Sequence, residues 1–137
     1  MTDHLHPVLD DAAIARMTSL ALAHVGDAVY EILVRPHLAC GGTPTAKNLH
    51  SRTIQLVRAS AQAEAVKRIQ PMLDEDEQTV LRHGRNAKPK SVPKSASVAE
   101  YAYATALEAL FGWLYLKGRY ERINELFEVI CQGFDAK

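Results

Sequence analysis

The chain has 137 residues, a length that predicts one domain over residues 1–137 with a single hydrophobic core. Its 16 basic and 16 acidic side chains cancel to a formal net charge of zero, which argues against a uniformly basic nucleic-acid-binding surface. No apolar run reaches the roughly 18 residues of a membrane-spanning helix, and the N-terminal residues lack the pattern of a secretory signal, so we expect a cytoplasmic protein with no membrane partner.

Apolar residues recur at helical spacing along most of the chain, and about five main helices are predicted. The first covers about residues 11–39 and is followed by a pair of glycines that act as a stop signal. Pro36 is expected to kink or shorten this helix, because proline removes a backbone donor. The second helix is predicted over about residues 45–70 and ends at Pro71.

Two capping patterns predict where later helices begin. Asp74 with Glu77 has the form of a capping box, and Ser97 with Glu100 repeats the device. The remaining predicted helices cover about residues 75–83, 98–117 and 119–132, with Gly118 separating the last two. No segment shows the alternation of a strand, so the predicted fold class is all-α.

Two carboxylates lie in otherwise apolar helical runs, Asp27 in the first predicted helix and Glu108 in the fourth. Removing a carboxylate from water costs several kcal/mol unless a charge, a metal or good donors compensate it. Neither residue has a lysine or arginine within one helical turn. If the two helices pack together, both carboxylates converge as oxygen ligands of the kind that Mg²⁺ prefers, a site suited to phosphodiester hydrolysis.

A structural role for the two acids is the competing interpretation. A single acid in an apolar helix is more often hydrogen-bonded to a tyrosine, a histidine or a cross-helix arginine than bound to a metal. Convergence of both acids on one site would reverse that balance. A purely structural helical dimer, whose acids pair with Tyr30, Tyr101 or Tyr103, therefore stays open.

Basic side chains are concentrated in two stretches of the sequence, residues 47–68 and residues 82–94. Residues 82–94 contain no acidic residue, and the predicted loop at 84–95 holds two prolines. This loop either contacts phosphates or is a solvated connection without a partner, and charge alone does not decide between them. The candidate phosphate-contacting residues are Arg82, Arg85, Asn86, Lys88, Lys90, Lys94, Lys47 and Arg52.

The sequence contains three motifs: Ala-Leu-Ala-His-Val-Gly-Asp-Ala-Val-Tyr-Glu at 21–31, Arg-His-Gly-Arg-Asn-Ala-Lys at 82–88 with Pro-Lys at 93–94, and Thr-Ala-Leu-Glu-Ala-Leu-Phe-Gly-Trp-Leu-Tyr-Leu at 105–116. Together they resemble those of the Mini-ribonuclease III family, a minimal form of ribonuclease III without a double-stranded-RNA-binding domain. The resemblance implies the all-α ribonuclease III endonuclease-domain fold and a homodimer. It also implies Mg²⁺-dependent cleavage of double-stranded RNA, with Mn²⁺ as a substitute ion.

The resemblance also implies the roles of particular residues. Asp27 matches the aspartate of the family's Gly-Asp-Ala-Val motif, and Glu108 matches the glutamate of its Glu-Ala-Leu-x-Gly motif, so both are expected to be catalytic metal ligands. Larger ribonuclease III enzymes carry further acids where this chain has Ala23 and Thr105, which leaves the number of metal ions per site open.

The family's natural task is trimming the duplex formed by the two ends of precursor 23S ribosomal RNA. The resemblance implies that substrate here, with a ribosomal protein on the rRNA as a helper. A catalytically inactive RNA-binding or structural dimer with the same fold is the alternative, and the acids at both metal positions argue against it. Because of their apolar density, Tyr30 and residues 111–116 are expected to line the dimer surface.

Overall fold

The computed structural model describes residues 1–42, 44–87 and 97–134. Within these ranges the regular secondary structure is entirely helical, which confirms the all-α prediction. The elements are α1 (Asp11–Ala15), α2 (Ser19–Cys40), α3 (Ala46–Val57), α4 (Ala59–Ile69), the 3₁₀ turn η1 (Gln70–Met72), α5 (Glu75–Asn86), α6 (Val98–Leu116) and α7 (Tyr120–Phe134). None of the helices in the described ranges combines the length and the apolarity that crossing a membrane requires.

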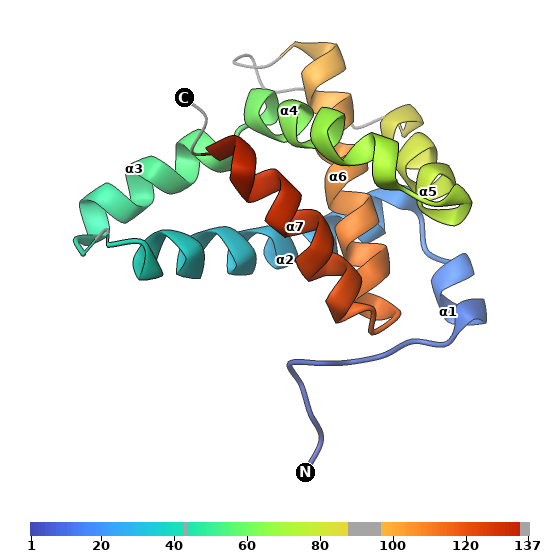
Figure 1. The fold of residues 1–137 in the computed structure, drawn as a ribbon. Coiled ribbons are helices and arrows are strands. Elements are labelled where there is room, and N and C mark those ends of the chain that lie inside the picture. Colours follow the sequence, from blue (N-terminus) through green and yellow to red (C-terminus); the bar gives the residue numbers. More distant parts are fainter. Residues whose placement is uncertain (43, 88–96, 135–137) are drawn as a thin grey trace.

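Helix α6 is the centre of the molecule. It packs against α2, α4, α5 and α7, and Figure 1 shows it crossing α2 while α4 passes over its first half. Its apolar residues supply much of the core, in which Leu107, Leu110, Phe111 and Leu114 are fully buried. Burial of each such side chain contributes roughly 1.5–3 kcal/mol relative to exposure.

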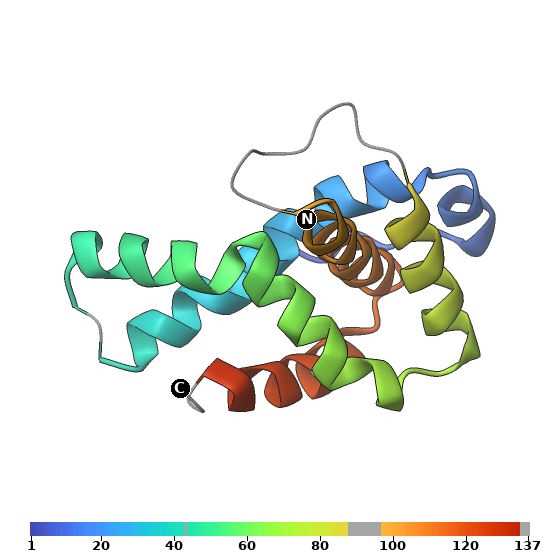
Figure 2. The same ribbon diagram turned by 90° about the horizontal axis from the view of Figure 1, so that it is seen from above.

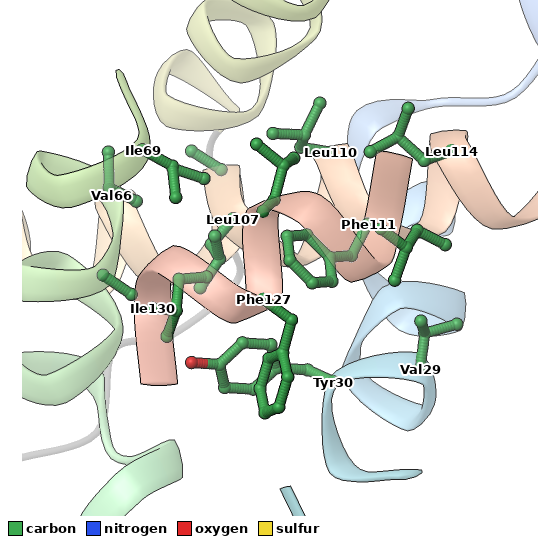
Figure 3. Close-up of a cluster of buried hydrophobic side chains, with 14 of the residues drawn as sticks. Val29, Tyr30, Val66, Ile69, Leu107, Leu110, Phe111, Leu114, Phe127 and Ile130 are labelled. Carbon is green, nitrogen blue, oxygen red and sulfur yellow. The ribbon is translucent and has the colours of Figure 1, made fainter. Parts of the chain in front are cut away.

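Two residues that were expected at a dimer surface belong to this core. Tyr30 is 1 % exposed and Phe111 is fully buried, and their rings meet edge to face with centroids 5.5 Å apart. Figure 3 shows both rings in the cluster with Phe127. The expectation that Tyr30 and the 111–116 stretch line a dimer surface was therefore wrong for these two side chains, because their apolar surface is used within the chain.

The predicted helix at 11–39 is broken in two. Thr18 has extended backbone and caps α2, its Oγ1 accepting a hydrogen bond from the Ala21 amide at 3.1 Å. Apolar periodicity continues across this break, which explains why the pattern did not reveal it. At the other end α2 runs through Pro36 to Cys40, so the proline does not terminate the helix.

The predicted helix at 45–70 is also two helices, with a break at Arg58. Arg58 has φ −64° and ψ 158°, an extended conformation between α3 and α4. The Gln62 side chain donates from Nε2 to the Val57 carbonyl oxygen at 2.7 Å and satisfies an acceptor at the end of α3. The break changes the direction of the chain, and α4 then packs on α6.

The capping predictions are confirmed. Asp74 and Glu77 form a complete capping box, and the Ser97 side chain accepts from the Glu100 amide at 3.1 Å. Helix α5 continues to Asn86, beyond its predicted end, because Gly84 lets it lie against α6: a Cβ there would be 2.8 Å from the Ala106 Cα. The predicted loop therefore begins later than residue 84, and the remainder of it lies mostly outside the described residues.

Candidate active site

Helices α2 and α6 touch backbone to backbone where Gly26 meets Gly112. A Cβ added to Gly26 would overlap the carbonyl of Glu108 and lie 2.8 Å from the Gly112 nitrogen. One added to Gly112 would overlap the carbonyl of Leu22. Neither position has room for a side chain, so the two helix axes approach more closely than larger residues would permit. Asp27 directly follows one glycine, and Glu108 lies one turn before the other.

The crossing brings the carboxyl groups of Asp27 and Glu108 into hydrogen-bonding contact. Asp27 is exposed, whereas Glu108 is half-buried. Burial, followed by the hydrogen bond and the negative charge of Asp27, raises the pKa of Glu108 to about 8. Glu108 therefore holds its proton to a higher pH than an ordinary glutamate does.

Two further side chains act on Glu108. Gln62, only 3 % exposed, lies near the Glu108 carboxyl group and opposes the rise in its pKa. Glu31 adds a weaker repulsion, which its own ion pair with Arg35 at 2.6 Å limits. The partners of Glu108 are thus Asp27 and a glutamine, and the tyrosine pairing of the structural alternative is not what the structure shows for this acid.

Ala23 and Thr105 occupy the two positions at which the resemblance places further acids in larger ribonuclease III enzymes, and neither side chain offers a carboxylate. Ala23 is buried and packs with Ile14 and Ala109. Thr105 is 6 % exposed, and its Oγ1 donates to the Tyr101 carbonyl of its own helix at 3.1 Å. Within the described ranges no group of three or more histidines, cysteines and acids is arranged to hold a metal ion.

The predicted basic residues fall into two groups. Arg82 and Arg85 line a pocket of about 200 Å³ on α5, where the Arg85 guanidinium lies 5.9 Å from the ring centroid of Tyr103. Asn86 is exposed at the end of the same helix. Lys47 and Arg52 are exposed on α3, which lies at the opposite end of the molecule from α5 (Figures 1 and 2). The other three candidates, Lys88, Lys90 and Lys94, lie outside the described residues.

Gln62 is the site residue that the sequence analysis missed. It lies on the same face of its helix as Val66 and Ile69, both of which are fully buried. A long polar side chain at a position where the pattern requires an apolar one was the available signal. Its partner on α6 is distant in the sequence, so the signal did not indicate what the amide contacts.

Comparison with known proteins shows the family of this chain. The family model described as the ribonuclease III domain matches residues 20–119, which include both carboxylates. Mini-ribonuclease 3 of Symbiobacterium thermophilum is 47% identical over 109 residues, covering 80% of this chain and 84% of the relative. Mini-ribonuclease 3 of a Thermoanaerobacter species is 40% identical over 125 residues, covering 91% and 88%. A crystal structure of a Fusobacterium nucleatum protein has a TM-score of 0.79 and 31% identity, covering 88% of this chain and 96% of that one.

The helical fold and the paired carboxylates, with these matches, define an RNA-cleaving ribonuclease built on a ribonuclease III domain. The chain belongs to the ribonuclease III family and, within it, to the Mini-ribonuclease 3 proteins. It is accordingly an endoribonuclease, and the family resemblance predicted from three sequence motifs is confirmed.

Proposed function

We propose that this protein cleaves double-stranded RNA in a Mg²⁺-dependent reaction, with Asp27 and Glu108 as the metal ligands. The observation that carries the proposal is the approach of two carboxyl groups, one of them half-buried: burial and then Asp27 raise the pKa of Glu108 to about 8. Neither acid forms a salt bridge among the described residues. Such a pair is unfavourable when both acids are ionised, unless a cation lies between them.

The residues present fit a hard divalent cation. Carboxylate oxygens are the ligands that Mg²⁺ prefers, commonly one or two of them with water and substrate phosphate, and Mn²⁺ accepts the same set. Gln62 supports the fit, because its Oε1 is buried next to the pair without a hydrogen-bond partner. When bound, Mg²⁺ would activate water and stabilise the charge that develops on the phosphate.

The chain's own residues have separate tasks in this proposal. Asp27, exposed at the surface of α2, is the ligand that faces incoming RNA. Glu108 is held by the helix crossing and by Gln62, so its carboxyl group is preorganised. Both acids must be ionised to bind the ion, so metal binding would release the proton that the raised pKa leaves on Glu108.

The arrangement of basic residues supports a long, double-stranded substrate. The crossing of α2 and α6 lies between α3 and α5 in both views, and each of those helices carries exposed basic residues (Figures 1 and 2). We infer that a rigid polyanion that contacts both helices would pass over the crossing of α2 and α6. A-form RNA is recognised mostly through phosphates and 2′-hydroxyl groups, which requires little base-specific equipment.

The proposed assembly is a homodimer, because one carboxylate pair serves one strand and two copies are needed to cut both. Leu20 and Ile32 on α2 are 41% and 65% exposed and offer apolar surface for a second copy. On the family resemblance, the proposed natural substrate is the duplex formed by the ends of precursor 23S rRNA in the cytoplasm, with a ribosomal protein on the rRNA as a helper.

The test is incubation of the purified protein with a labelled RNA duplex at low salt, in Mg²⁺ or in EDTA, beside D27N and E108Q variants and a single-stranded control. Cleavage of the duplex that requires Mg²⁺ and is lost in both variants is the expected result. Duplex binding without cleavage would indicate a catalytically inactive RNA-binding protein with the same fold. Neither binding nor cleavage would favour a purely structural dimer.

A further inference from the structure

Gln62 is a buried polar residue whose side chain makes contacts with two other helices. Its side chain is almost completely buried, at 3 % exposure. Its amide lies between two elements: Nε2 donates to the Val57 carbonyl oxygen at 2.7 Å at the end of α3, and the same side chain lies close enough to Glu108 on α6 to lower the pKa of that acid. Its Oε1 is buried without a hydrogen-bond partner.

The Val57 carbonyl fixes the orientation of the amide. A carbonyl oxygen only accepts hydrogen bonds, so the nitrogen of the Gln62 amide must face it. The amide nitrogen carries two hydrogens, and the second is available for the Glu108 carboxylate, which as an ionised group also only accepts. The break at Arg58 places Gln62 in the first turn of α4, close enough to α3 and α6 to contact both.

Stability alone does not account for a glutamine at this position. An unpaired buried acceptor is destabilising, and an apolar side chain of similar length would avoid it. The neighbouring buried positions of α4, at Val66 and Ile69, are apolar and fully buried. The amide is therefore retained at a cost to the core, at the point where α4 meets a carboxylate of the site.

We propose that Gln62 is a positioning residue that holds the Glu108 carboxylate in the orientation needed to bind the metal ion. This inference rests on the proposed role of Glu108 as a metal ligand. Groups that hydrogen-bond metal ligands set ligand orientation, and their loss typically lowers metal affinity or activity about 10- to 100-fold. The Val57 hydrogen bond makes the α3–α4 junction the support on which this ligand depends.

The test is the Q62M variant, because methionine is similar in length and cannot donate a hydrogen bond. We expect Mg²⁺ binding to the RNA-free protein, measured by isothermal titration calorimetry, to weaken about 10- to 100-fold. At limiting Mg²⁺ the kcat for duplex cleavage should fall, and higher Mg²⁺ should restore it. The KM for the duplex should remain within about twofold. A residue that only supports the fold would not produce a defect that added Mg²⁺ corrects.

A matched control is Q78M. Gln78 likewise donates from its amide to a backbone carbonyl, that of Gln70 at 2.9 Å, at the neighbouring junction between α4 and α5. The Q78M substitution removes the same kind of hydrogen bond at a place that does not contact Glu108. We expect Q78M to lower the Tm and to leave Mg²⁺ affinity unchanged, whereas Q62M changes both.

Mg²⁺ affinity of folded Q62M equal to that of the unchanged protein would overturn the proposal. If Q62M does not fold, a crystal structure of the unchanged protein with Mn²⁺ decides: the Gln62 amide contacts the Glu108 carboxylate in the bound state, or the proposal fails. Failure of the proposed function is distinguishable, because the unchanged protein would then bind no Mg²⁺ and cleave no duplex, and the role of Gln62 would fall with it.

Discussion

Gly26 of α2 and Gly112 of α6 lie in direct backbone contact, and this contact sets the distance between the two carboxyl groups of the site. Both glycines are buried within the crossing. The atoms nearest to them belong to the backbone, which cannot move aside by a side-chain rotation. Packing density in such a crossing is high, so a shift at one glycine is passed to the neighbouring residues. The helix crossing therefore positions the candidate site, although neither glycine carries a functional group.

Replacing Gly112 with alanine should separate the helices. The added Cβ would overlap the Leu22 carbonyl, and we expect a loss of about 1–3 kcal/mol in the free energy of unfolding, measured by urea denaturation. A displacement of the ligands by about 1 Å should also reduce cleavage by about 100-fold. The control is G41A, at a position with φ −83° outside the crossing, and a comparable loss of activity there would contradict this explanation.

The stability of the metal-free protein should fall as pH rises from about 5 to 8. The pKa of Glu108 is raised from 4.5 to about 8 by burial and by Asp27, so in this range the folded state binds a proton that the unfolded state has lost. Each pKa unit corresponds to about 1.4 kcal/mol. Chemical denaturation at several pH values should show this slope, and E108Q should reduce it. Parallel slopes in both proteins would show that Glu108 is not its source.

The buried ion pair between Glu77 and Arg122 should affect stability and not catalysis. Arg122 donates to both carboxylate oxygens of the fully buried Glu77, each at 2.8 Å, and to the Met72 carbonyl. Removing one partner of a buried pair costs about 3–5 kcal/mol, so E77Q should lower the Tm markedly. At temperatures well below that Tm, kcat should be unchanged.

The control for E77Q is E125Q, because Glu125 contacts the same Arg122 at 3.2 Å but is 59% exposed. We expect it to change the free energy of unfolding by less than about 1 kcal/mol. The contribution of Glu77 to stability also depends on pH. Burial alone would raise the pKa of Glu77, but hydrogen bonding by Arg122 outweighs it and lowers this pKa. This stabilisation is therefore present above the usual glutamate pKa and is lost as pH falls through the lowered value.

The basic residues on α5 should contribute to RNA affinity and not to the chemical step. R85Q removes one exposed charge beside Tyr103, so we expect weaker duplex binding and a salt dependence whose slope falls by about 1. Filter binding at several salt concentrations in EDTA measures both. R119Q, at the turn before α7, is the control with the same charge change. An equal loss in R119Q would mean that net charge, and not this patch, determines binding.

The exposed apolar residues of α2 predict how two copies associate. A charge at Ile32, which is 65% exposed, should disfavour a homodimer through that face, and I32D should sediment as a monomer. The same charge at Ile54, 49% exposed on α3, is the matched control and should leave the dimer intact. An unchanged sedimentation coefficient for I32D would place the dimer surface elsewhere or exclude this dimer.

Local features of the sequence were sufficient for the fold class, and they singled out the two acids of the candidate site. Asp27 and Glu108 stood out because a carboxylate in an apolar helical run is costly, and that cost is visible in the residues around it. The capping box at Asp74 and the cap at Ser97 were predicted correctly, because a cap depends on residues only three positions apart. Helix breaks at Thr18 and Arg58 were missed, since apolar periodicity continues across both.

Only the tertiary structure decided which side chains meet. The contact of Gly26 with Gly112, the pairing of Asp27 with Glu108 and the position of Gln62 each join residues on different helices. Apolar density did not distinguish Tyr30 in the core from Ile32 on the surface, because both lie in one helix with similar neighbours. Composition and spacing determine how each helix forms, whereas burial and pKa depend on where the helices cross, and that is set by packing between residues far apart in the chain.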